Sequence, residues 1–271
     1  MQITRENTVQ LVRIRKEAWA YADMGDGFLR LIVIEGNYDH DFFRIAEHFL
    51  SEGGDFLDAG ANYGLLSFGL AKQLADRVRF HLFEPNPNLV PVIQRSAKLY
   101  RDMHLVVNQS AVSNFQGVIK VFFDETQTGA SHFDPVNGQE VPCVTIDQYL
   151  EAHNIGTVPL LKLDVEGYEL VALKGAAQSI AKAAIRAIYF EYFEKWLQRV
   201  QPPSELLHFL RKSDYEVYFC REHDLARFGG PTHQHRAVAG GKMIPLRAVG
   251  DGPLPSMTDL LALPKAAADR I

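Results

Sequence analysis

The stretch FLDAGANYGLLSFGLAKQL (residues 56–74) has the pattern of a buried strand, a turn with two glycines and a helix. Asp58 stands among apolar residues near the end of the strand, and Gly60 and Gly64 follow it. Apolar residues then recur at helical spacing up to Leu74. A strand that turns sharply into a helix through glycines brings its backbone close to a small polar ligand. This stretch therefore predicts a ligand site at the end of a parallel strand.

Strand and helix patterns alternate along the rest of the chain. Repeated strand–helix units predict an α/β fold with a doubly wound, mostly parallel sheet. We predict residues 28–34 as a strand, 39–54 and 168–183 as helices, 117–123 and 140–146 as paired strands, and 258–265 as the last strand. Residues 1–54 are predicted to form an N-terminal extension, a strand and a helix packed on the core. Residues 55–271 are predicted to form the main domain.

Composition excludes several classes of partner. The chain has 271 residues and a net charge of −5, which gives no basic footprint for nucleic acid. No apolar run is long enough to span a membrane, and the N-terminus has no signal-peptide pattern, so we predict a cytoplasmic protein. Cys143 and Cys220 lie far apart in sequence and are predicted to be free thiols. The sequence does not indicate an oligomeric state.

The acids near the glycine turn indicate which ligand it binds. Glu84 ends the next predicted strand, where a carboxylate can accept both hydroxyls of a ribose. The turn departs from the dinucleotide pattern G-x-G-x-x-G, because Asp58 occupies the first glycine position. A carboxylate there repels a pyrophosphate but suits a ligand with an ammonium and a sulfonium. This favours S-adenosylmethionine. A turn that serves only helix–strand packing is the alternative, and the presence of Glu84 argues against it.

Five segments resemble one known family. They are FLDAGANYG (56–64), FHLFEPNP (80–87), SAVSN (110–114), VTIDQYL (144–150) and, most specifically, LLKLDVEGYELVALKGA (160–176). Together they are similar to the FkbM-type S-adenosylmethionine-dependent methyltransferases. The resemblance implies the class I methyltransferase fold, which is Rossmann-like with seven strands, the last antiparallel. It also implies that the methyl acceptor is usually an oxygen, often on a sugar, a lipid-linked glycan or a polyketide-type product.

The resemblance also implies which residues hold the cofactor. They fall into three groups: Asp58, Gly60, Ala61 and Asn62 at the methionine portion; Glu84, Pro85 and Asn86 at the ribose; and Ser110 and Ala111 at the adenine. The second glycine of the turn, Gly64, is also predicted to belong to the cofactor site. Residues 124–140 depart from the short, serine-rich loop of the family. Because this segment is polar and lies between two predicted strands, we predict that it covers the acceptor site.

Candidate catalytic residues follow the fourth parallel strand. Asp164 stands at its carboxyl end, where it can take or orient the proton of an acceptor hydroxyl. Glu166 can share that role or cap the next helix. His132 in the polar loop and Glu191 at the end of the fifth strand are further candidates for the base. Lys162, inside a buried strand, is predicted to have an acidic partner.

Two patterns contain residue types that can bind a metal ion. Carboxylates at 164, 166 and 191 could hold a divalent cation, but their spacing does not require one. His233 and His235 stand in a Gly/Pro-rich segment without further ligands, and we predict a surface loop there. The prediction is therefore an enzyme without a metal that transfers a methyl group to an oxygen of a small-molecule, sugar or glycan acceptor. A nicotinamide-dependent dehydrogenase and a non-catalytic cofactor-binding scaffold are the alternatives.

Overall fold

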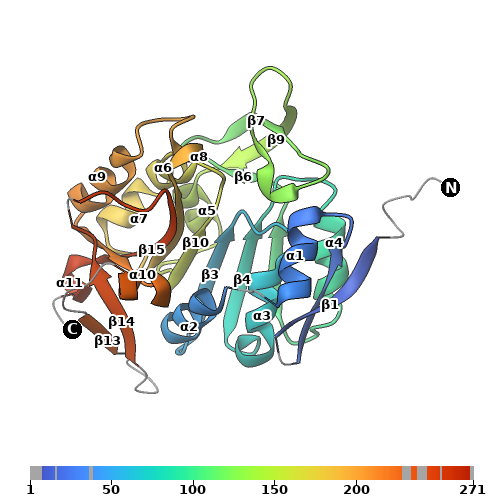
Figure 1. The fold of residues 1–271 in the computed structure, drawn as a ribbon, viewed down its shortest axis with the longest axis horizontal. Coiled ribbons are helices and arrows are strands. Elements are labelled where there is room, and N and C mark those ends of the chain that lie inside the picture. Colours follow the sequence, from blue (N-terminus) through green and yellow to red (C-terminus); the bar gives the residue numbers. More distant parts are fainter. Residues whose placement is uncertain are drawn as a thin grey trace.

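A nine-stranded sheet forms the centre of the molecule. The computed structural model describes residues 8–15, 17–36, 39–227, 233–236, 243–250 and 252–268. The strands are β3 (Gly54–Ala59), β4 (Val78–Phe83), β5 (His104–Asn108), β10 (Leu160–Leu163), β11 (Ile188–Phe193), β12 (Tyr215–Phe219), β13 (His233–Arg236), β14 (Met243–Ala248) and β15 (Met257–Pro264). Their order across the sheet is β13–β14–β12–β15–β11–β10–β3–β4–β5 (Figure 1).

The strand directions confirm the predicted fold class. β11, β10, β3, β4 and β5 pair in parallel, whereas β15 is antiparallel to both β11 and β12. The seven strands from β5 to β12 are thus the predicted doubly wound, mostly parallel sheet with its last strand antiparallel. β14 and β13 extend it as two further antiparallel strands. All four residues of β10 are buried, as expected for a central parallel strand covered on both faces.

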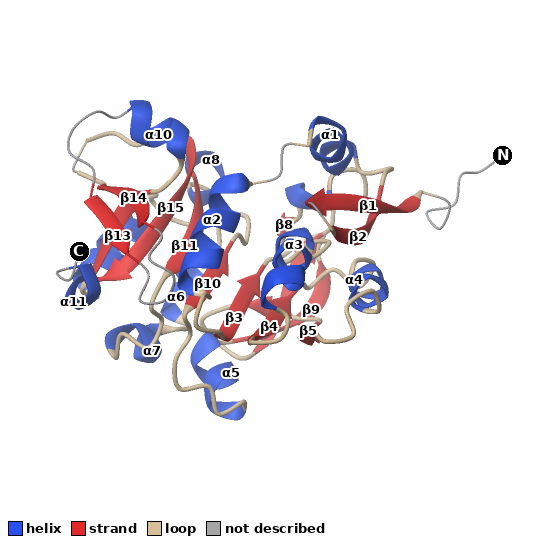
Figure 2. Ribbon diagram, turned by 90° about the horizontal axis from the view of Figure 1, so that it is seen from below, coloured by secondary structure: helices blue, strands red, loops and turns tan. Residues whose placement is uncertain are grey.

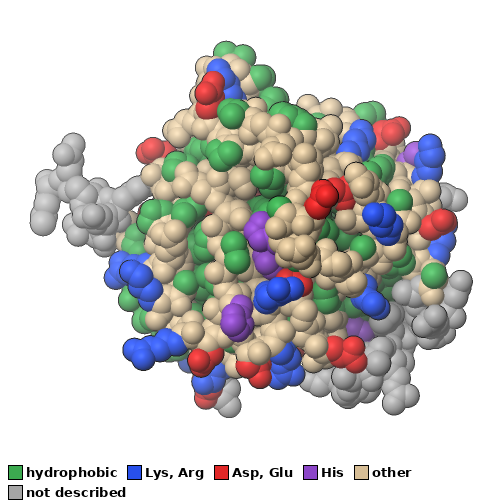
Figure 3. All heavy atoms as spheres, turned by 180° about the vertical axis from the view of Figure 1, so that it is seen from behind, with side chains coloured by type: hydrophobic (Ala, Val, Ile, Leu, Met, Phe, Trp, Pro, Cys, Tyr) green, Lys and Arg blue, Asp and Glu red, His purple; other side chains and the backbone are tan. Residues whose placement is uncertain are grey.

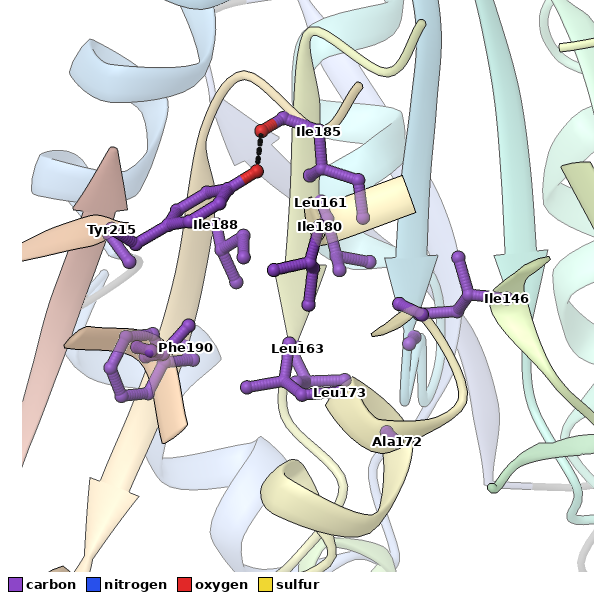
Figure 4. Close-up of a cluster of buried hydrophobic side chains, with 14 of the residues drawn as sticks. Ile146, Leu161, Leu163, Ala172, Leu173, Ile180, Ile185, Ile188, Phe190 and Tyr215 are labelled. Carbon is purple, nitrogen blue, oxygen red and sulfur yellow. Dashed lines mark hydrogen bonds between the residues drawn. The ribbon is translucent and has the colours of Figure 1, made fainter. Parts of the chain in front are cut away.

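Helices cover both faces of the sheet (Figure 2). One face carries α2 (His40–Phe49), α3 (Leu65–Leu74) and α4 (Val90–Ala97), and the other carries α5 (Ile146–Ala152), α6 (Glu169–Lys174), α7 (Ala177–Ala181) and α9 (Ser204–Lys212). Adjacent strand residues point to opposite faces of the sheet. Phe56 therefore packs in the first core, between the sheet and α2, α3 and α4, and Leu57 packs in the second core, between the sheet and α5, α6, α7 and α9. The second core is drawn in Figure 4, where the Tyr215 hydroxyl donates a hydrogen bond of 2.5 Å to the Ile185 carbonyl.

A smaller four-stranded sheet follows β5. It contains β6 (Ala111–Val112), β7 (Gly117–Phe122), β8 (His132–Phe133) and β9 (Gln139–Val144), in the order β6–β9–β7–β8. β7 and β9 are antiparallel, which confirms the predicted strand pair. The polar segment between them contains a 3-10 turn at Thr128–Ala130 as well as β8. Figure 1 shows this sheet above the end of the central sheet.

The predicted strand at residues 28–34 is wrong. These residues belong to the helix α1 (Gly27–Glu35), which follows a hairpin of β1 (Val9–Arg15) and β2 (Ala18–Asp23). A short apolar run is compatible with a strand and with a helix, and here Leu29 is buried while Ile34 is 73% exposed. The hairpin packs on the first core, and the Tyr21 N–H donates to Ser96 Oγ in α4. The domain boundary at residues 54–55 stays a prediction.

The predicted single helix at 168–183 is divided into α6 and α7. Gly175 lies at the division, and a Cβ atom there would be 2.0 Å from the Ser113 carbonyl oxygen. The Asp147 carboxylate accepts hydrogen bonds from the amides of Gln178 and Ser179, which lie in the first turn of α7. A separate cap therefore stabilises the second helix. Neither the close approach nor the remote cap is visible in the local pattern.

The chain after β12 forms α10 (Glu222–Arg227), β13, β14, β15 and α11 (Lys265–Ala268), and α8 (Glu194–Leu197) follows β11. The loop predicted around His233 and His235 is wrong, because both residues lie in β13; their side chains are outside the described part of the structure.

Cys143 and Cys220 are free and buried. Within the described ranges, no helix has the length and apolarity needed to cross a membrane. The face in Figure 3 carries scattered charges of both signs.

Candidate active site

The carboxyl ends of β3, β4 and β10 bring three predicted acids to one edge of the sheet. Parallel pairing sets Asp58 beside Leu82 and Lys162, so Glu84 and Asp164 follow neighbouring strand ends. Ligands of doubly wound sheets bind at this edge. The register therefore places the residues predicted from the glycine turn next to those of the LDVEG segment.

The backbone of the turn explains its glycine. Gly60 has φ 78°, a conformation that strains residues with a side chain, and a Cβ atom there would lie 1.8 Å from the Asp164 carbonyl oxygen. Its N–H and that of Ala61 both donate to the Phe83 carbonyl oxygen at 3.0 Å. The turn is thus fixed against the ends of β4 and β10. Gly64 has φ 71° and occupies the N-cap of α3.

Glu84 is held at the centre of the site by two backbone amides. Its carboxylate accepts hydrogen bonds of 2.8 Å from the N–H groups of Asn62 and Asn86, and only 6% of the residue is exposed. Burial raises the pKa of Glu84 to about 7, against the lowering effect of these two hydrogen bonds. Each carboxylate oxygen has a second lone pair for a ligand hydroxyl. Glu84 is therefore oriented before any ligand binds.

Lys162 joins the glycine turn to the end of β10. The acidic partner predicted for it is confirmed, because two acids, Asp58 and Asp164, pair with it. Its ammonium group lies 3.3 Å from Asp58 Oδ1 and 3.2 Å from Asp164 Oδ2, and it donates to the Gly60 carbonyl oxygen at 2.8 Å. Burial by itself lowers the pKa of Lys162, but the two carboxylates outweigh burial and raise it. Ser67 donates to Asp58 Oδ2 at 2.6 Å. Asp58 is consequently a buried support for Lys162, whereas Asp164 keeps 39% of its side chain exposed.

Further carboxylates surround Asp164. Burial and the neighbouring acids raise the pKa of Glu166 to about 9 and of Glu191 to about 10. Glu169, not Glu166, supports the turn before α6, because its carboxylate accepts from the amides of Val165 and Gly167. Among the residues that the structure describes, no group of three or more histidine, cysteine or acidic side chains has metal-binding geometry. This acidic environment favours a cationic ligand.

Two pockets meet at this edge. The first is lined by nine of the predicted residues: Gly60, Asn62, Glu84, Pro85, Ser110, Ala111, His132, Asp164 and Glu166. The second lies on the side of α1 and α2 and is lined by Ala61, Glu191, Arg221 and Asp259 among others. Gly60, Asn62, Thr128 and Asp164 line both pockets. Asp164 is thus the predicted catalytic residue that faces both spaces.

Three of the predicted cofactor residues, Asp58, Gly64 and Asn86, do not line either of these two pockets. Asp58 contacts the site through Lys162, and Gly64 and Asn86 contribute backbone, Gly64 as the N-cap of α3 and Asn86 through its amide to Glu84. His132 stands in the wall of the first pocket between the rings of Phe122 and Trp196, with Nδ1 3.0 Å from the Ala130 carbonyl oxygen. An Nδ1–H donor there leaves Nε2 as the basic nitrogen.

The family model described as the methyltransferase FkbM domain matches residues 58–217. The chain belongs to the FkbM methyltransferase family. The matched region begins at Asp58 in the glycine turn and includes every predicted site residue up to Glu191. It leaves the hairpin, α1 and α2 outside.

Solved methyltransferases are similar to this chain at low sequence identity. Methyltransferase FkbM from Methylobacillus flagellatus KT is 16% identical, with a TM-score of 0.46 over 78% of this chain. This chain covers 44% of that protein's length. Precorrin-6y C5,15-methyltransferase from Geobacter metallireducens GS-15 is 10% identical, with a TM-score of 0.43 over 83% of this chain and 86% of that one. M. jannaschii TYW2, solved with AdoMet, is 9% identical with a TM-score of 0.39 over 94% and 85%. Comparison with curated proteins finds no match.

The sequence did not indicate several residues of this candidate site. Ile119, Val121 and Phe123 form an apolar wall of the first pocket from β7 and the residue after it. Their alternation is a signal for one face of a strand, but the pattern does not say that the face meets a ligand. Asp26 and Thr128, which stand 102 residues apart in sequence, meet at the second pocket. Local patterns contain no signal for such a contact.

Proposed function

We propose that the chain transfers a methyl group from S-adenosylmethionine to a hydroxyl oxygen of a small-molecule, sugar or glycan acceptor. The observation that carries this proposal is the arrangement of Glu84 and Asp164 around the Gly60 turn, with Asp164 on the wall shared by two pockets. One pocket suits the adenosine of the cofactor. The other suits the acceptor, so that Asp164 would stand where the two ligands meet.

The first pocket offers the groups that an adenosine requires. The free lone pairs of Glu84 would accept the ribose hydroxyls, and Pro85 would form the wall behind the sugar. Ser110 and Ala111 would flank the adenine, with the apolar face of β7 opposite. A buried carboxylate that already holds two amides loses little freedom when it binds a diol.

The methionine end would lie over the glycine turn. Gly60 and Asn62 line both pockets, and Ala61 lines the second. Asp58 is 1% exposed, so we assign it a role through Lys162 and not a direct contact. The surrounding acids would stabilise the sulfonium and the ammonium of the cofactor.

The bound cofactor would supply a methyl carbon activated by its sulfonium. The methyl group would pass to the acceptor oxygen with S-adenosylhomocysteine as the leaving group, and the hydroxyl proton would go to a carboxylate or to water. Asp164 is the candidate for that carboxylate. Lys162 binds one of its oxygens at 3.2 Å, which orients the carboxylate and leaves its exposed side to the acceptor. Glu166, whose pKa of about 9 keeps it protonated near neutral pH, is a weaker candidate.

The Asp58 and Asp164 carboxylates also weigh against a dehydrogenase, because negative charge at the glycine turn repels a pyrophosphate. Two buried free cysteines are consistent with a cytoplasmic setting, which we include in the proposal. A scaffold without catalysis would bind cofactor but transfer nothing.

Calorimetric titration with S-adenosylhomocysteine and, separately, with NADH tests the cofactor. Binding of S-adenosylhomocysteine alone supports the proposal, and tight NADH binding contradicts it. Transfer of a labelled methyl group to a panel of sugars, glycans and hydroxylated small molecules then tests the acceptor. We expect turnover to fall most in Asp164→Asn, less in Glu166→Gln and least in His132→Ala. Cofactor binding without transfer to any acceptor would favour the scaffold.

A further inference from the structure

Asp26 is a buried acid that binds two segments far apart in the chain. It follows β2, and only 3% of the residue is exposed. Its Oδ1 accepts a hydrogen bond of 3.0 Å from the Leu29 amide at the start of α1. Its Oδ2 accepts two from Thr128, one of 2.9 Å from the amide and one of 2.7 Å from the hydroxyl. Three donors thus converge on one carboxylate.

A backbone contact beside Asp26 supports the same junction. The Gly27 amide donates to the Thr126 carbonyl oxygen at 3.2 Å. Within the loop, the Asp124 carboxylate accepts from the amides of Thr126 and Gln127. The loop therefore has a defined shape of its own, and it meets the N-terminal segment through Thr126 and Thr128.

Thr128 continues the chain of contacts into the cofactor pocket. Its hydroxyl oxygen lies 3.1 Å from Oδ1 of Asn62, and the Asn62 backbone N–H donates to the Glu84 carboxylate. The single hydroxyl proton goes to the Asp26 carboxylate, so the Asn62 contact is a hydrogen bond when the amide turns its NH₂ group toward Thr128. Asp26, Thr128, Asn62 and Glu84 then form one connected series.

We propose that Asp26 is a positioning residue of the cofactor site, which holds the loop at residues 124–131 closed over Asn62. The proposal rests on the proposed function, because it takes the first pocket as the cofactor site. Thr128 lines both pockets, so the closed loop forms part of the partition between them. Cofactor release requires the loop to lift, and the bonds to Asp26 oppose this movement.

Thr128→Val tests this contact with little change in shape. It keeps the amide bond to Asp26 but removes the hydroxyl bond, and a hydrogen bond to a buried charge corresponds to roughly 10- to 100-fold in an equilibrium constant. We expect amide hydrogen exchange at residues 126–131 to accelerate by about that factor in the protein without ligand. S-adenosylhomocysteine should dissociate faster by a similar factor. Thr128→Ser restores the hydroxyl and should restore both rates.

Two further variants keep the test specific. Gln127→Ala shortens an exposed side chain of the same loop, keeps the backbone bond to Asp124, and should leave the cofactor dissociation rate unchanged. In Asp26→Asn an NH₂ group replaces one carboxylate oxygen and cannot accept a hydrogen bond from Leu29 or Thr128. This variant should therefore reproduce the effect of Thr128→Val. Circular dichroism and thermal melting verify that each variant is folded.

Unchanged exchange of residues 126–131 in both Thr128→Val and Asp26→Asn would overturn the proposal. So would faster exchange with an unchanged dissociation rate, because the closed loop would then have no effect on the cofactor. A wild-type protein that binds no S-adenosylhomocysteine contradicts the proposed function, and with it the positioning role. The exchange comparison without ligand then still decides whether Asp26 holds the loop.

Discussion

Replacing Glu84 tests the cofactor site most directly. Glu84→Ala removes the carboxylate that would accept two ribose hydroxyls. Each hydrogen bond to a charged acceptor contributes about 1.5–3 kcal/mol, so two correspond to about 3–6 kcal/mol, or roughly 100- to 10,000-fold in the dissociation constant. Glu84→Gln keeps one carbonyl oxygen but turns an NH₂ group toward an amide donor, and we expect a smaller loss of about 10- to 100-fold.

The pH dependence of binding gives a second measure of the same group. The pKa of Glu84 is about 7 in the free protein, and its ionised form is the better acceptor for the ribose. Affinity for S-adenosylhomocysteine should therefore rise as the pH rises through about 7, and this rise should be absent in Glu84→Gln. The folded pKa lies above the unfolded value of 4.5, so this group lowers the free energy of unfolding as the pH rises from about 4.5 to 7. Glu84→Gln should flatten that part of the stability profile.

Calorimetry from pH 6 to 8, with Glu140→Ala as the exposed acid control on β9, measures these effects. Denaturant titration over the acid range measures the stability profile. Because the amides of Asn62 and Asn86 lose their acceptor in Glu84→Ala, this variant should also melt at a lower temperature than wild type. An affinity within twofold of wild type in Glu84→Ala would refute the assignment of Glu84 to the ribose. A pH profile identical in wild type and Glu84→Gln would refute the role of its ionisation.

Three further substitutions separate chemistry from architecture. Asp164→Asn should bind S-adenosylhomocysteine nearly normally but lose roughly 10²–10⁴-fold in methyl transfer, and full activity would show that it is not the base. Lys162→Met leaves Asp58 and Asp164 without their cation, so urea titration should show a loss of about 3–5 kcal/mol, and a loss below 1 kcal/mol would contradict the buried ion pair. Gly60→Ala should prevent cofactor binding or folding, because its Cβ would overlap the Asp164 carbonyl oxygen, whereas Gly156→Ala, which has no atom within 4 Å of its new Cβ, should remain close to wild type. Normal binding by Gly60→Ala would contradict the close approach.

Strong local patterns predicted the central sheet. β3, β4 and β10 are short apolar runs that end in acids or glycines, and both faces of such strands must be covered. Errors arose where two structures share one local pattern. The run in α1 has the composition of a strand, and only the environment of Leu29 and Ile34 shows which residues face the protein. The break between α6 and α7 depends on Ser113, which lies more than sixty residues away in sequence.

The site could be predicted only in part for a similar reason. Asp58 lies near the end of β3, and Glu84 and Asp164 directly follow β4 and β10; parallel pairing alone brings these strand ends together. The sequence could show that Lys162 needed an acid but not that it has two. Thr128 could not be placed at all, because its position depends on a contact with the N-terminal segment. Assigning individual residues to the cofactor stays a prediction until binding is measured.

The position of β15 has a consequence for how the chain folds as it is synthesised. β15 pairs with β11 on one side and with β12 on the other, although both of these strands precede it in sequence. Until the ribosome has released residues 257–264, the nascent sheet consists of two parts, each with an open strand edge. Open edges recruit strands from other chains. The growing polypeptide is therefore vulnerable to aggregation until β15 has been synthesised, and insertion of β15 between its two neighbours ends that exposure.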